Sequence, residues 1–193
     1  MVRGSIRPGG RTERVRQKVA ETVLQFIKDG KGDFTVQDIS ERSGIARSTI
    51  YARWPSREQL VGEALRAHNS IFQVEPQDNW RAHLQHAAFA FRDFSARPDE
   101  IAINVQTAQL SVEHLAEQTY GQWSDISTRI AAPLREAQRN GEIRPEIDPI
   151  LVISTLFTSI AGHIVIAKDV PTDDHLRQMV NLLVSGCEAK PST

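Results

Sequence analysis

The stretch that decides the fold is SGIARSTIYARWPSREQL, residues 43–60. One helical segment ends at "SG", and a second runs from about residue 46 to about residue 53, because Pro55 cannot continue it. Gly44 has no Cβ, so it can adopt the left-handed conformation that a tight turn between two helices needs. Two short helices joined in this way are typical of a helix-turn-helix.

The residues on either side supply further helices. A first helix is expected from Thr12, as the cap, to about Lys28, because Val15, Val19, Val23 and Ile27 form one apolar stripe. The helix that ends at "SG" opens at Thr35, and Asp38 completes a capping box there. Another helix, the fourth in chain order, begins after Ser56 and runs over about 57–73.

The second helix of the pair carries a polar outer face. Ile39, Ile45 and Ile50 are spaced to pack the two helices together, and this leaves outward Arg47, Ser48, Thr49, Tyr51 and Arg53. In a major groove, arginine can bond guanine, and hydroxyl groups can bond bases or phosphates. The alternative interpretation is a solvated helical hairpin inside a bundle.

Charge is unevenly distributed along the 193 residues, whose net charge is −1. Residues 1–60 carry twelve Lys and Arg against seven Asp and Glu, and residues 61–193 carry eleven against seventeen. The net charge is therefore +5 over residues 1–60 and −6 over residues 61–193. This difference predicts that a polyanion would bind the N-terminal third. The single cysteine, Cys187, excludes a disulfide framework and fits a reducing cytosol, so we expect a cytoplasmic protein.

Five further helices are expected: about 80–96, one from the RPDE break at residues 97–100 to about 110, and about 113–140 (kinked near Pro133), 149–168 and 173–188. No segment alternates as a strand does. The uncharged run 149–167 is near the length of a membrane span, but its serine, threonine and histidine residues favour a buried interface helix, and we expect no membrane contact. No apolar run follows the basic N-terminus, so we expect no signal peptide.

These elements predict an all-α fold with an N-terminal three-helix helix-turn-helix domain and a C-terminal bundle of five to six helices. The expected domains are a flexible basic arm (1–11), a DNA-binding domain (12–56) and a ligand-binding and dimerisation domain (57–193).

The segment FTVQDISERSGIARSTIYARWPSREQLVGEAL, residues 34–65, resembles the DNA-binding segment of the TetR family of bacterial transcription regulators. The loop GEIRPEIDP, residues 141–149, resembles the loop before that family's eighth helix. Ser40 and Ser43 stand where the family usually has alanine, and Arg57 stands where it usually has lysine.

The resemblance implies roles for individual residues. Thr35, Tyr51 and Arg57 would hold DNA phosphates, whereas bases or the adjacent backbone would be contacted by Arg47, Ser48, Thr49 and Arg53. Trp54 would pack the third helix onto the first. The last two helices would join two copies into a homodimer, which suits an inverted-repeat operator in double-stranded DNA.

The resemblance also implies a pocket for a small-molecule effector among the fifth to eighth helices. Candidate lining residues are Phe89, Phe91, Phe94, Gln106, Gln109, Tyr120, Trp123 and His163, although for each one taken singly ordinary core packing is the favoured interpretation. Because this lining carries few charges, the expected effector is uncharged or weakly polar.

No nucleophile elbow, phosphate-binding glycine loop or zinc-protease motif occurs, so we expect no enzyme activity and no cofactor. His83 and His86 share a helix, but the sequence places no further metal ligand near them, so no metal site is expected. The predicted function is a DNA-binding repressor released by a ligand. An activator, a regulator that responds to a protein partner, and a helical ligand-binding or scaffolding protein without DNA binding remain alternatives.

Overall fold

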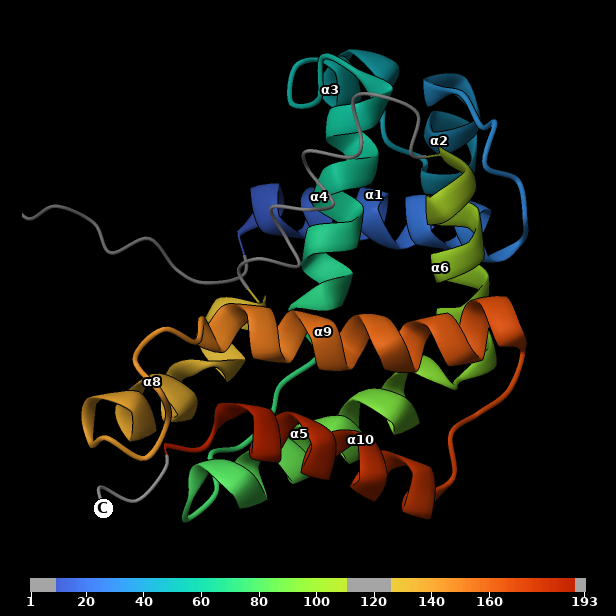
Figure 1. The fold of residues 1–193 in the computed structure, drawn as a ribbon. Helices are drawn as coiled ribbons and strands as arrows, with labels where there is room; N and C mark the ends of the chain where they lie inside the picture. Colours follow the sequence, from blue (N-terminus) through green and yellow to red (C-terminus); the bar gives the residue numbers. More distant parts are fainter. Residues whose placement is uncertain (1–9, 111–125, 190–193) are drawn as a thin grey trace, which may run out of the picture. The chain divides into compact units, whose positions relative to one another are not determined.

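The computed structural model describes residues 10–110 and 126–189, and every regular element in those ranges is a helix (Figure 1). One isolated antiparallel bridge pairs Ile143 with Glu188. The predicted all-α fold class is confirmed. Within the described ranges the chain forms two compact units, residues 10–71 with 105–110 and residues 72–104 with 126–189. The helix at 57–69 lies in the first unit, whereas the sequence-based division began the second domain at residue 57.

The first unit is built from α1 (Arg11–Lys28), α2 (Val36–Ser43), α3 (Arg47–Tyr51) and α4 (Arg57–Asn69). Three residues of the predicted α1 stripe, Val19, Val23 and Ile27, are fully buried, and α1 packs against α2 and α4. The predicted cap at Thr12 is wrong. The helix already begins at Arg11 after Gly10, which has no side chain with which to cap it.

Local signals set the ends of α2. The Thr35 hydroxyl accepts a hydrogen bond from the Asp38 backbone N–H at 3.2 Å, and the Asp38 carboxylate accepts one from the Thr35 N–H at 2.7 Å. These bonds satisfy amide donors that the first turn of a helix leaves unpaired. The helix ends at Gly44, which has φ 67° and ψ 16°. The predicted capping box and left-handed turn are both confirmed.

The second unit contains α5 (Trp80–Ser95), the first part of α6 (Pro98–Leu110), a helical stretch at residues 126–130, α8 (Ala132–Arg139), α9 (Pro149–Gly162), the π-helical turn η1 (His163–Ala167) and α10 (Asp173–Cys187). At its centre the Phe91 and Phe157 rings stack with centroids 4.1 Å apart. Phe72 meets both rings edge-on. This aromatic cluster joins α5 to α9.

Two predicted helices are interrupted. A turn at Ala131 separates residues 126–130 from α8, and Pro133 lies in the first turn of α8, where its missing N–H costs no hydrogen bond. Residues 113–125 of that predicted helix lie outside the described ranges. The helix expected over 149–168 is α-helical only to Gly162, and Lys168, at φ 55°, ends the π-helical turn that follows.

Among the described helices, Pro149–Ala167 is long and apolar enough to span a membrane by length and composition alone. Its mean hydropathy is 2.1, and one third of it is buried. Core helices of soluble proteins meet the same criteria, so this is weak evidence for a membrane span.

Candidate nucleic-acid interface

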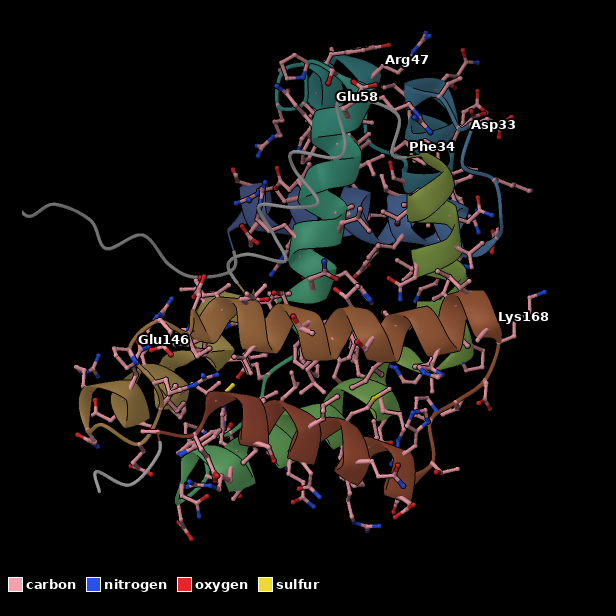
Figure 2. The ribbon with its side chains drawn as sticks, in the orientation of Figure 1. Asp33, Phe34, Arg47, Glu58, Glu146 and Lys168 are labelled. Carbon is pink, nitrogen blue, oxygen red and sulfur yellow. The ribbon has the colours of Figure 1, made fainter. Side chains whose placement is uncertain are left out.

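The helix α3 presents a polar face because its apolar residues turn inward. Ile39 of α2 and Ile50 of α3 are fully buried, and Ile45 is half-buried, as predicted. The opposite face exposes Arg47, Ser48 and Tyr51, and Arg53 follows just beyond the helix. Thr49 is half-buried. Arg47 extends away from the ribbon in Figure 2.

Two cations at this face are not neutralised by the chain itself. In residues 10–110 and 126–189, neither Arg47 nor Arg53 forms a hydrogen bond or an ion pair. Tyr51 between them is 53% exposed. An unpaired guanidinium in solvent keeps all its donors for a phosphate or a base edge. The geometry therefore suits the DNA contacts that the sequence predicts, and those contacts remain a prediction.

The turn between α2 and α3 is held by a buried hydroxyl. Ser43 is 1% exposed, and its Oγ accepts a hydrogen bond from the Ile45 backbone N–H at 3.2 Å. This bond satisfies an amide that the turn would otherwise leave unpaired. The serine therefore stabilises the turn by a contact that the alanine usual in the family could not make.

Trp54 fixes the end of the α3 segment through Glu63 on α4. Trp54 is 3% exposed, and its Nε1–H donates to Glu63 Oε2 at 2.6 Å. Arg16 on α1 donates to Glu63 Oε1 at 2.7 Å. Desolvation raises the pKa of Glu63, but the hydrogen bonds from Trp54 and Arg16 outweigh it, and the net pKa is lowered. One ionised carboxylate thus ties α1, α4 and the residue beyond α3 together.

Arg57, predicted to hold a phosphate, binds the loop before α2. Its Nε donates to the carbonyl oxygen of Phe34 at 3.1 Å, and its Nη2 donates to the carbonyl of Gly32. The guanidinium also lies over the Phe34 ring, 4.8 Å from the centroid. These contacts give Arg57 a structural role that the sequence did not reveal, while its phosphate contact remains a prediction.

A second arginine holds the other side of the same loop. Arg42 lies 4.8 Å over the Phe26 ring and pairs with Asp29 at 3.1 Å. Phe26 and Phe34 touch each other, with centroids 5.5 Å apart. The loop between α1 and α2 is therefore packed between two guanidinium groups, which fixes the position of Thr35 at the start of α2.

The candidate effector residues that the structure describes belong to both units. Phe89, Phe91, Phe94 and His163 belong to the second unit, whereas the Gln106 amide lies beside Gly30 in the first. Phe91 is a core residue, stacked on Phe157. The His163 ring packs edge-on against His175, 4.7 Å between centroids. The side chain of Gln109 and all of Tyr120 and Trp123 lie outside what the structure describes.

The histidines considered for a metal site have separate positions. His83 is buried, and its Nε2 lies 2.9 Å from the Ile130 carbonyl oxygen, while His86 on the same helix is exposed. The described residues contain no group of three or more side chains suited to a metal ion. His83 therefore joins α5 to residues 126–130 through a buried polar contact.

Comparison with known proteins agrees with this geometry. Residues 19–64 match the profile described as bacterial regulatory proteins, tetR family. An HTH-type transcriptional regulator of Mycobacterium tuberculosis is 26% identical over 133 residues, which is 68% of each chain. The chain carries the DNA-binding segment of the TetR family. It is a DNA-binding transcriptional regulator, with α2 and α3 as its helix-turn-helix.

Two further similar proteins are more distant in sequence. The A-factor receptor protein of Streptomyces griseus is 23% identical over 131 residues, which cover 66% of this chain and 45% of that protein. Among solved structures, the flavonoid-responsive regulator FrrA superimposes with a TM-score of 0.70 at 19% identity, over 93% of this chain and 100% of that one. At this identity the superposition supports the fold alone.

Replacing Glu63 with glutamine should destabilise the fold in a pH-dependent way. Because the folded pKa of Glu63 is lowered, its charge stabilises the fold above the unfolded pKa of about 4.3, and that contribution disappears as pH falls through the folded value. We expect Glu63→Gln to lose roughly 1 kcal/mol at pH 7. Urea unfolding at several pH values measures this loss, which should shrink as pH falls below about 4.3 and vanish only below the lowered folded pKa. Glu41→Gln, on the exposed face of α2, is the control, and a pH-independent loss would contradict the assignment.

Arg57→Ala should lower stability, whereas Arg47→Ala should not. Removing Arg57 leaves two loop carbonyls without their donor and uncovers Phe34, which should cost about 2–3 kcal/mol in urea unfolding. Arg57→Lys should recover little of this, because an ammonium lacks the planar fork that reaches both carbonyls. Equal stabilities for the Arg57→Ala and Arg47→Ala variants would refute the loop-holding role.

Proposed function

We propose that this regulator is a homodimeric repressor that binds an inverted-repeat operator and is released from it by a small, mostly apolar molecule. Its residues of DNA contact would be those of the exposed α3 face and its flanks: Thr35, Arg47, Ser48, Thr49, Tyr51, Arg53 and Arg57. The regulator would act in the cytoplasm, where its DNA and the effector meet.

The observation that carries the dimer is the apolar surface of the last two helices. Leu151 on α9 is 62% exposed, Ile166 on η1 is 83% exposed, and Leu182 on α10 is 76% exposed. One third of the most apolar helix of the described residues is buried in a single copy, and the rest is half-buried or exposed. Large exposed apolar surfaces mark interaction sites, and the same surface of a second copy would cover this one.

A twofold dimer accounts for the inverted repeat. It would carry two copies of α3 with opposite polarity, so both could read the same half-site sequence on the two strands. On α9, Ser159 has a small side chain and Gly162 has none, which would permit close approach of the helices of the two copies.

The control by a small molecule draws on the relatives. One relative carries the name A-factor receptor protein, and one structural neighbour is named as flavonoid-responsive. In this chain the aromatic cluster of Phe72, Phe91, Phe94 and Phe157 gives the second unit an apolar interior. A molecule that binds the free regulator better than the DNA-bound regulator would weaken operator binding. Operator DNA would weaken the binding of that molecule by the same factor.

Selection from random duplexes tests the proposal. The wild-type protein should enrich inverted repeats whose half-site centres lie about one or one and a half DNA turns apart, roughly 10–15 base pairs. Leu182→Glu should weaken the dimer by about 2–5 kcal/mol, because two carboxylates would enter an apolar interface. Sedimentation velocity measures the dimer, and a gel shift on the selected duplex should show the matching fall in affinity.

Gln85→Glu, on the exposed face of α5, adds the same charge outside the proposed interface and should leave both measurements unchanged. A stable monomer at micromolar concentration, or enrichment of single half-sites only, would contradict the proposal.

A further inference from the structure

A cavity of about 450 Å³ lies within the first unit, between α1 and α4. The two helices cross in Figure 1 and pack together. Ala20 and Leu24 of α1 and Ala67 and Ile71 at the end of α4 contribute its apolar lining. Two alanines on the facing helices leave room for a guest, and Ile71 is 66% exposed at this site. The volume falls within the range of small-molecule pockets.

The polar lining of the cavity is largely satisfied by internal pairs. Arg16 pairs with Glu63 at 2.7 Å and with Glu13 at 3.5 Å, and Gln17 donates to Glu21 at 3.0 Å. These contacts leave one charged lining residue, the exposed Arg66, without a hydrogen bond or ion pair within the described ranges. A ligand that enters this cavity therefore meets an apolar surface, the Arg66 guanidinium without an ion pair, and the Glu21 carboxylate, whose hydrogen-bond partner is the neutral Gln17 amide.

From this lining we infer that the first unit holds a second small-molecule site, which takes a monocarboxylate with an apolar body. The carboxylate pairs with Arg66, whose fork geometry matches it, and the apolar body covers Ala20, Leu24 and Ala67. This site is distinct from the effector pocket expected in the second unit.

The cavity shares a wall with the contact that fixes the end of the α3 segment. Glu63 lines the cavity. Its Oε1 accepts a hydrogen bond from Arg16, and its Oε2 accepts the one from Trp54. A ligand beside Glu63 therefore changes the surroundings of the Trp54 indole directly. Any effect on operator affinity rests on the proposed function, but binding itself does not, so the two can fail separately.

The test uses the DNA-free, full-length protein labelled with ¹⁵N at its three tryptophans. The indole signal of Trp54 is assigned with Trp54→Phe, and the protein is titrated with sodium octanoate. We expect the Trp54 indole signal to shift saturably. Arg66→Glu and Ala67→Leu, both at exposed positions, should each weaken binding about tenfold or more, since one removes the cation and the other fills the cavity.

Two controls make the result specific. Arg14→Glu makes the same charge change on the exposed part of α1 outside the cavity and should keep the wild-type affinity. Octylammonium has the same chain with the opposite charge and should bind more weakly. A Trp54 signal that does not move, an affinity unchanged in both cavity variants, or equal binding of octylammonium would overturn the inference.

Discussion

A helix of five residues cannot hold its own shape in water, because nucleation costs more than so few hydrogen bonds return. The recognition helix α3 therefore depends on what packs behind it. Ile50 is buried together with Ile39 of α2, and Gly44 sets the turn between the two helices. At the far end, Trp54 is bound to Glu63 of α4. The exposed arginines are presented in a fixed register only because these buried contacts exist.

The arginines of the first unit divide by their surroundings into two groups. Arg16, Arg42 and Arg57 direct their donors to Glu63, Asp29 and the carbonyls of the α1–α2 loop. Arg47 and Arg53 carry the same side chain but meet no partner in the described ranges. Because part of the positive charge of this region stabilises the fold, counting arginines overstates the charge available to DNA. The structure shows which of these guanidinium groups have a partner within the described ranges and which have none.

The features that the sequence predicted well are those set by near neighbours. The Thr35–Asp38 capping box, the left-handed Gly44 and the inward stripe of α1 each depend on residues within a few positions, so spacing alone reveals them. The Arg57 contacts with Gly32 and Phe34, and the contact of Arg16 with Glu63, join residues 23 to 47 positions apart. Such pairings follow from how the helices cross, which periodicity does not give. The effector pocket stays a prediction for the same reason, since helical spacing marks buried faces without showing which faces meet.

The central claim is that the unpaired cations of the α3 face bind DNA, and the salt dependence of binding tests it most directly. Fluorescence anisotropy on the selected operator would compare the wild type with the Arg47→Ala, Arg53→Ala double variant from low to high salt. Arg139→Ala, an exposed arginine of the second unit that pairs with Glu136, is the control. We expect the double variant to bind the operator more weakly and to unfold in urea like the wild type. The slope of log binding constant against log salt concentration should be reduced by about 0.9 for each phosphate that the variant no longer binds. Unchanged affinity and slope in the double variant would contradict the claim.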